Sequence, residues 1–307
     1  MINRLLIRIK ATQLVYASLQ SDQPQHIMSE ALIESIESSQ KLYNYLLALI
    51  VKVTEYRRAQ FELARSKYLA SEEELNPNTR FVDNQIPALI CEHSNVLENC
   101  ENEHLLSDFD TDLYRSLLAD IESNAAYQEY MNQTAPSTFE QDRDLWVEIL
   151  NQVFPNSEKL DEVLESKNIY WNDDLTTVLQ VVVKTVSKLK ATTDAIDPVK
   201  IFRSDNDMKF ARELLKYALE DYQANIRLID SIATNWETSR MMLMDRVVMA
   251  TALAEIQHFP DIAVAISLNE YLELAKHYCS ANSSRFINGI LDKIVKEWRA
   301  EKKIIKA

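Results

Sequence analysis

The stretch that decides the fold is SLNEYLELAKHYCSANSSRFINGILDKI, residues 267–294, near the carboxyl end of a 307-residue chain. Apolar residues recur every three or four positions on both sides of the polar segment CSANSS. This spacing predicts two amphipathic helices joined by a short loop. Ser267 and Glu270 form an S-x-x-E pattern, which predicts a capping box at the start of the first helix.

The second of these helices contains Gly289, the only glycine of the chain. A glycine inside a helix costs about 1 kcal/mol relative to alanine, so its position needs a reason. Gly289 lies on the polar flank of an apolar stripe, and two explanations are open: another helix crosses closely there, or a ligand or partner approaches the backbone. The stripe consists of Phe286, Ile287, Ile290, Leu291, Ile294 and Trp298.

The composition excludes several large classes of protein. Average usage is roughly 7% glycine, and tight hairpins, Walker loops and dinucleotide-binding loops all need several glycines. The chain is instead rich in residues that favour helices, so we expect an all-α protein. With 47% hydrophobic residues it has enough apolar side chains for a sizeable core.

Other whole-chain features indicate where the protein works. No run of 18 apolar residues predicts a membrane span, and the first residues do not resemble a secretory signal. The three cysteines, Cys91, Cys100 and Cys279, form no CxxC pair. We therefore expect a cytoplasmic protein without a zinc site.

The net charge of −14 is unevenly distributed along the chain. Residues 1–20 carry +3 and residues 293–307 carry +4, whereas residues 21–204 carry −16 and residues 205–292 carry −5. The two basic ends can therefore form a local anion-binding surface that the average charge hides.

Hydrophobic periodicity predicts the main helices. Residues 2–19 fit one helix with Arg4 and Arg8 on the face opposite its apolar stripe. A second, long helix is expected from about residue 28 to residue 69, and the valine-rich residues 175–190 are expected to form a buried helix.

Two further helices are expected towards the carboxyl end. One long amphipathic helix is predicted over residues 208–236, and a more hydrophobic one over residues 238–256.

The opening stretch resembles the carboxyl-terminal signature of the NusB family of transcription antitermination factors. That family has an I-N-E-x-x-E-L-A-K helix, a short polar loop and then S-x-x-F-V-N-G-V-L-D. Three other stretches are similar to family motifs: NWETSRMMLMDR, FARELLKYAL and RIKATQLVY. The matching residues of the opening stretch are Asn269, Glu270, Glu273, Leu274, Ala275, Lys276, Ser283, Phe286, Asn288, Gly289, Leu291 and Asp292.

The resemblance covers about residues 2–20 and 205–298. It implies a NusB-like helical bundle made of a basic amino-terminal helix, residues 1–20, and a carboxyl-terminal helical domain, residues 205–307. Residues 21–204 are then a large, acidic, helical insertion.

The resemblance also implies a function. Members of the family form a heterodimer with NusE, which is ribosomal protein S ten, and the pair binds boxA, a single-stranded RNA element in ribosomal RNA leaders. The complex joins RNA polymerase and suppresses premature termination. No reaction is catalysed and no cofactor is needed.

The expected sites follow from the matched positions. Cations would contact phosphates, Phe286 would stack on a base, and residues at a helix amino terminus would attract phosphate. Tyr16 and Asp245 match family positions at the RNA and NusE surface. For every candidate the alternative is a solvated helix face, a helix cap or an intramolecular contact. The RNA-binding candidates are Arg4, Arg8, Lys10, Asn282, Ser283, Arg285 and Phe286.

Two other functions are open. One is a NusB-fold scaffold that binds proteins and no RNA. The other is a carboxylate-bridged di-iron bundle, which needs E-x-x-H pairs, and the chain contains Glu101-x-x-His104 and Glu255-x-x-His258. His258, however, lies two residues before Pro260, at a helix end rather than inside a bundle.

Overall fold

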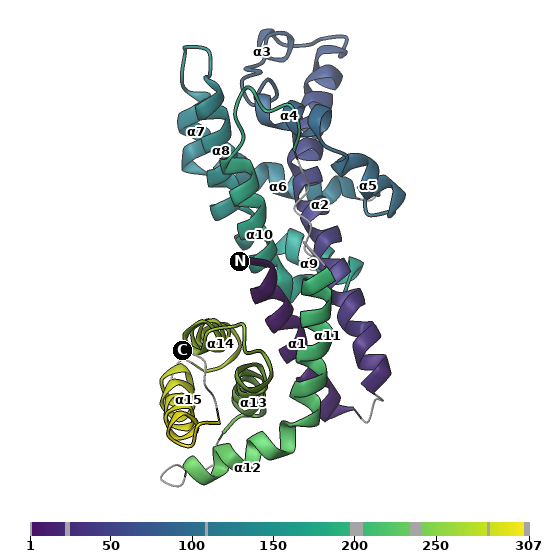
Figure 1. Ribbon diagram of the computed structural model, residues 1–307. Helices are drawn as coiled ribbons and strands as arrows, with labels where there is room; N and C mark the ends of the chain where they lie inside the picture. Colours follow the sequence, from purple (N-terminus) through teal and green to yellow (C-terminus); the bar gives the residue numbers. More distant parts are fainter. Residues whose placement is uncertain are drawn as a thin grey trace. The chain divides into compact units, whose positions relative to one another are not determined.

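The chain divides into two compact units in a computed structural model (Figure 1). Unit 1 comprises Met1–Ile36 and Phe202–Ala307, and unit 2 comprises Glu37–Ile201. Every regular element of the described residues is a helix, which confirms the all-α prediction. The structure describes residues 2–21, 25–107, 110–196, 205–233, 241–280 and 283–303.

Unit 1 is built around a helix that is buried on all sides. Helix α13 packs against five other helices of the unit, and every residue of it from Val247 to Ile256 is buried. A helix without a polar face is typical of a core position. The helices of unit 1 are α1 (Ile2–Gln20), the first part of α2 (Gln25–Arg65), α11 (Asp205–Glu220), α12 (Tyr222–Ile232), α13 (Leu243–His258), α14 (Val264–Tyr278) and α15 (Ser283–Ala300).

Two local predictions for this unit are wrong. The single helix expected over residues 208–236 is interrupted at Asp221, between α11 and α12. The interruption lets α11 pack on α1 and α13 while α12 packs on α13 and α15, which one straight helix would not do. The expected capping box does not form, because α14 begins at Val264 and Ser267 lies inside it.

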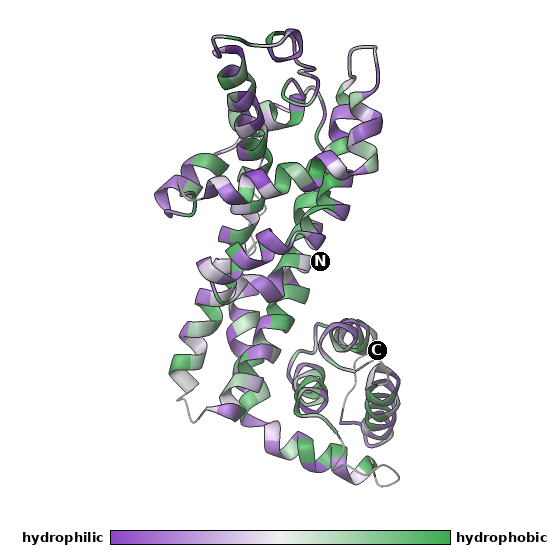
Figure 2. Ribbon diagram, turned by 180° about the vertical axis from the view of Figure 1, so that it is seen from behind, coloured by the Kyte–Doolittle hydropathy of each residue, from purple (hydrophilic) through white to green (hydrophobic). Residues whose placement is uncertain are grey.

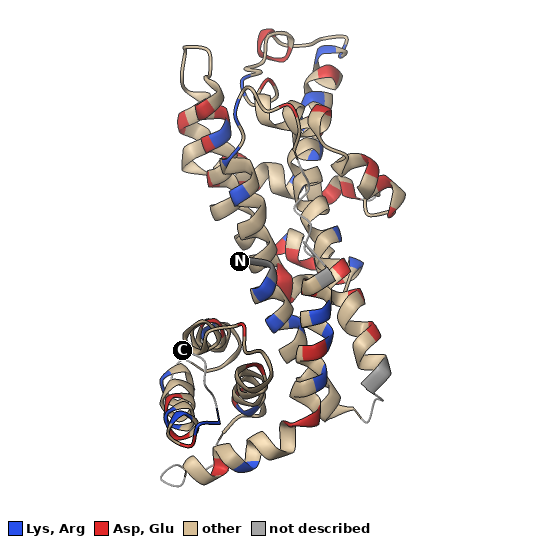
Figure 3. Ribbon diagram, viewed as in Figure 1, with Lys and Arg blue, Asp and Glu red and all other residues tan. Residues whose placement is uncertain are grey.

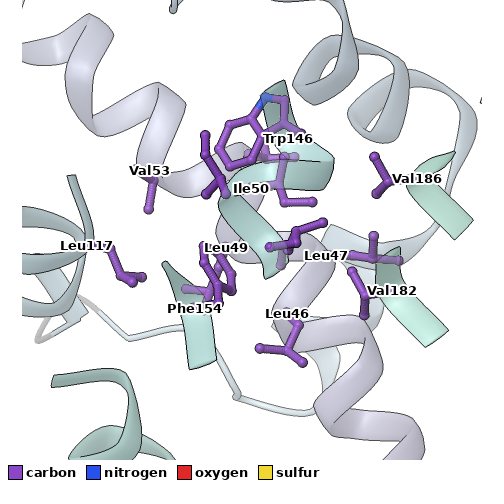
Figure 4. Close-up of a cluster of buried hydrophobic side chains, with 14 of the residues drawn as sticks. Leu46, Leu47, Leu49, Ile50, Val53, Leu117, Trp146, Phe154, Val182 and Val186 are labelled. Atoms are coloured by element: carbon purple, nitrogen blue, oxygen red, sulfur yellow. The ribbon is translucent and has the colours of Figure 1, made fainter. Parts of the chain in front are cut away.

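Unit 2 has its own core, centred on helix α2. Side chains of α2 from Leu46 to Val53 meet side chains of α6, α8 and α10 and of the short 3₁₀ helix η2 (Figure 4). The valine-rich segment is a helix whose apolar side is buried, as predicted. The helices after α2 are α3 (Glu72–Leu75), α4 (Gln85–His93), α5 (Val96–Asn102), α6 (Thr111–Ser123), α7 (Ala125–Met131), α8 (Phe139–Gln152), η2 (Phe154–Asn156), α9 (Glu158–Lys167) and α10 (Trp171–Ser187).

The acidic excess of the chain lies in unit 2. Unit 2 contains 15 Lys and Arg against 29 Asp and Glu, whereas unit 1 contains 18 of each. The whole net charge of −14 therefore belongs to unit 2.

Many helices show a hydrophobic stripe beside a hydrophilic one (Figure 2). None of the described helices is long and apolar enough to cross a membrane.

Candidate nucleic-acid interface

Helix α1 places Arg8 in a buried polar network. Arg8 is only 2% exposed. Its Nε and Nη2 atoms donate to the two carboxylate oxygens of Glu255, at 2.8 Å each, and Nη1 lies 3.5 Å from Glu270. Glu255 also accepts hydrogen bonds from the hydroxyls of Ser267, at 2.7 Å, and Tyr271, at 3.1 Å. The carboxylate is thus satisfied by three surrounding side chains.

The electrostatics of this network favour a charged Arg8 and a neutral Tyr271. Burial disfavours the guanidinium charge, but the hydrogen bonds and charge of Glu255, together with Tyr271 and Glu270, outweigh it, and the pKa of Arg8 lies above its ordinary value. Burial, together with the nearby Glu255, raises the pKa of Tyr271 well above its ordinary value. The network therefore ties α1, α13 and α14 together through an ion pair and two hydroxyl donors.

Helical spacing predicted that Arg8 lies on a polar face of α1, where it would reach solvent. That expectation is wrong, because the Arg8 side chain is buried. Lys10, the third cation expected to contact phosphate, is also buried, at 1% exposed. The physical reason is that α1 packs against α11, α13 and α14 at once, so that residues 6–12 are all buried. Arg4 differs, because its side chain is 44% exposed; its Nε lies 3.5 Å from Asp207 and its guanidinium stands over the ring of Phe210.

Two separate sets of contacts remove the support for a di-iron site at Glu255 and His258. Both oxygens of Glu255 are occupied by Arg8, and the Nε2 atom of His258 lies 2.6 Å from a carboxylate oxygen of Asp221. The His258 ring also stacks on Tyr217, with ring centres 3.9 Å apart. Across the described ranges, no group of three or more His, Cys, Asp or Glu is placed to hold a metal ion.

The two residues expected at a partner surface have different surroundings. Tyr16 is half-buried on α1. Asp245, at the start of α13, is 5% exposed. Burial and a hydrogen bond to Asp245 raise the pKa of the Cys279 thiol to about 12. Asp245 therefore makes an intramolecular contact with the end of α14.

The four RNA-binding candidates at the start of α15 also differ in their surroundings. Asn282 lies outside the described residues. Ser283 is buried; its hydroxyl lies 2.7 Å from that of Ser280, and its N–H donates to the Ser280 carbonyl at 2.8 Å. Arg285 is exposed and Phe286 is half-buried. Among the described candidates at this helix end, Arg285 is thus the exposed cation and Phe286 is the partly exposed aromatic residue.

The solvent side of α15 is a cationic stripe, of which only Arg285 was predicted from the sequence as a site residue. Four cations of α15 fall on one side of the helix at 100° per residue. They lie opposite the buried Ile287, Leu291 and Ile294. Lys296 pairs with Asp292 at 2.6 Å, whereas the other three cations make no ion pair within the described residues. We call this the α15 basic face (blue on α15 in Figure 3); its members are Arg285, Lys293, Lys296 and Arg299.

Gly289 lies within the α15 basic face and is exposed. A Cβ atom built on Gly289 would meet no atom of the described residues within 4 Å. The first explanation for the glycine, a closely crossing helix, is therefore wrong for the part of the chain that the structure describes. Close approach by a molecule outside this chain is the explanation that stays open.

Comparison with known proteins gives the family. The family model described as the NusB family matches residues 175–296. The NusB antitermination protein of Dictyoglomus thermophilum is 37% identical over 101 residues, which are 33% of this chain and 70% of that protein. The chain belongs to the NusB family.

Other NusB proteins are similar over the same share of the chain. The protein of Pelotomaculum thermopropionicum is 40% identical over 98 residues, 32% of this chain and 68% of its own length. That of Symbiobacterium thermophilum is 36% identical over 92 residues, 30% of this chain and 60% of its own length. The chain thus spans about three fifths to two thirds of these NusB relatives, and no solved structure matches it.

The NusB match includes Arg285, Lys293 and Lys296 of the α15 basic face and the carboxylate of the buried network, but it ends before Arg299 and begins inside α10. Residues 37–174 of unit 2 lie outside it. The extra helical part is therefore an addition to the NusB portion of the chain. The sequence-based limits of this addition were residues 21 and 204, whereas the compact unit runs from Glu37 to Ile201.

Proposed function

We propose that this NusB-family chain is a transcription antitermination factor that binds boxA-type single-stranded RNA. It does so together with NusE, ribosomal protein S ten, as part of the antitermination complex on RNA polymerase in the cytoplasm. It catalyses no reaction and needs no cofactor. The family membership supports the general role, and the α15 basic face around Gly289 is the observation that carries the RNA site.

The α15 basic face has the chemistry that single-stranded RNA requires. Exposed cations attract phosphates and release counterions when RNA binds. The missing side chain at Gly289 leaves open space, so an RNA backbone approaches the helix between the cations. Phe286 stands at the amino-terminal turn beside Arg285, where free N–H groups favour a phosphate and an aromatic ring stacks on a base.

The α1 residues take different roles in this proposal. Arg4 is exposed enough to contact a phosphate. Arg8 and Lys10 are buried, and Arg8 positions α1 through Glu255 rather than touching RNA. Tyr16 and the Asp245 region would contribute to the NusE surface.

The experiment measures binding of a labelled boxA oligonucleotide by fluorescence anisotropy at several salt concentrations, with and without NusE. The variant Lys293→Ala/Arg299→Ala removes two cations from the α15 basic face. We expect weaker binding and a salt slope smaller by about 1.4, since each phosphate contact to single strands contributes about 0.7. The control Lys188→Ala/Lys190→Ala removes two exposed cations from unit 2 and should leave the slope unchanged.

The outcomes separate the two candidate functions. Equal slopes for both variants would exclude the α15 basic face as the RNA site. NusE binding without any saturable RNA binding would favour the alternative function, a protein-interaction scaffold on the NusB fold.

A further inference from the structure

One end of unit 2 exposes a concentration of large apolar side chains. Leu63 is 70% exposed, Tyr68 98%, Leu69 86% and Leu75 47%. Of the nine large hydrophobic residues that are exposed among the described residues, four therefore lie between positions 63 and 75. Single exposed hydrophobic residues are ordinary, but a group of them marks an interaction surface.

Leu63 lines an open groove of about 790 Å³, and Tyr68, Leu69 and Leu75 belong to the same stretch of chain, from the end of α2 to α3. The end of α2, the turn after it and α3 form its walls, and its lining includes Phe61, Leu63, Ala64 and Pro77. The guanidinium of Arg57 stands 4.7 Å from the centre of the Phe61 ring. The groove lies within the volume range of ligand sites, and its openness to solvent suits a chain segment.

The walls of the groove are held in place by local contacts. The Ser71 hydroxyl accepts from the Glu74 N–H at 3.2 Å, and the Glu74 carboxylate accepts from the Ser71 N–H at 2.9 Å. Lys67 forms an ion pair with the same Glu74, at 2.5 Å, and Arg57 pairs with Glu122 at 2.9 Å. The groove is therefore formed before any partner arrives, and two of its cations are already neutralised.

The charged side chains around the groove that form no ion pair favour a cationic partner. Glu62, Glu72 and Glu73 are exposed and make no ion pair within the described residues (α3 is red in Figure 3). Arg58, which donates to a backbone carbonyl, and Arg65 offset part of this charge. The net charge of −14 on the unit sets the sign of the longer-range field, which attracts positively charged partners.

We propose that this groove binds a cationic amphipathic segment of a partner protein. Apolar side chains of that segment pack on Phe61, Leu63 and Ala64, and its Lys and Arg side chains lie near Glu62 and Glu73. A helix with apolar residues at positions i, i+3, i+4 and i+7 has the matching pattern. This inference concerns unit 2 and does not depend on RNA binding by unit 1.

The test uses the full chain and a labelled amphipathic peptide of about 18 residues built from Leu, Lys and Ala, with its apolar residues at helical spacing. A second peptide has Glu in place of every Lys. We expect saturable one-to-one binding of the Lys peptide and at least tenfold weaker binding of the Glu peptide. Leu63→Ser should weaken Lys-peptide binding at least tenfold, and Glu62→Gln/Glu73→Gln should weaken it as well.

The control is Ile169→Ser, which removes an 83% exposed apolar side chain elsewhere on unit 2 and should leave binding unchanged. All of these positions are exposed, so helical content by circular dichroism should stay constant. Absence of saturable binding, or equal losses in the control, would overturn the proposal. So would a dimer in sedimentation that Leu63→Ser converts to monomer, or binding of anionic vesicles but not of the peptide.

Discussion

Replacing Arg8 with methionine isolates the energetic role of the buried network. Methionine keeps the unbranched stem of the side chain, so the packing change is small. The carboxylate of Glu255, 0% exposed, keeps only its two hydroxyl donors and loses its cation. Breaking a buried ion pair by removing one partner costs about 3–5 kcal/mol. At roughly 2–4 °C per kcal/mol for domains of this size, we expect Tm to fall by about 6–20 °C.

The assay is calorimetry of the full chain, because the two units can unfold in separate transitions. Only the transition of unit 1 should move. Arg4→Met is the matched control, since its 44% exposed side chain contributes about 0–1 kcal/mol. In Arg8→Met/Glu255→Gln the amide oxygen accepts from one hydroxyl, the amide NH2 donates to the other, and the buried charge is removed, so part of the lost stability should return.

Two results would refute this reasoning. A loss of less than about 1 kcal/mol for Arg8→Met is the value of an exposed pair and would contradict burial of the ion pair. Measured well below Tm, the same variant should bind RNA with an unchanged salt slope. A slope smaller by about 0.7 would make Arg8 a phosphate contact after all.

Three other outcomes follow from the packing. Gly289→Ala should stabilise unit 1 by about 1 kcal/mol in denaturant unfolding, because the added methyl group meets open space. Gly289→Leu should keep the fold but weaken RNA binding. A destabilised alanine variant would contradict the open space around Gly289. Burial and the hydrogen bond to Asp245 raise the pKa of Cys279 to about 12, so this thiol should react slowly with iodoacetamide at pH 8 and about tenfold faster per pH unit up to about 12. Exposed Cys91 should be labelled first in mass spectra, and early labelling of Cys279 would refute its burial and its bond to Asp245. Trp146→Ala should cost about 3–5 kcal/mol in the unit 2 transition alone, and a shift of both transitions would speak against two separate cores.

The sequence by itself determined the class of the fold and its family. Glycine scarcity and helical periodicity are properties of composition and of neighbouring residues, so they required no knowledge of distant contacts. The stripe of α15 was readable for the same reason: Ile287, Leu291 and Ile294 are buried as their spacing predicts. The motif around Gly289 indicated the NusB family before any geometry was known.

Only the tertiary structure decided which polar residues reach solvent. Periodicity gives the faces of one helix but not the number of helices packed around it. Arg8 sits on a polar face by spacing, yet three helices enclose it, and its partner Glu255 is 247 residues away in the chain. Ser267 fits a cap by local pattern, but the same buried carboxylate takes its hydroxyl.

The same limit applies to the candidate site. Arg8 and Lys10 are buried on α1, whereas Lys293 and Arg299 are exposed on α15, where they follow the family motif in the chain. Whether a charged side chain binds a ligand or holds the core together depends on burial and on the charges that surround it. Those are set by segments far apart in sequence, and they exist only once the helices have packed.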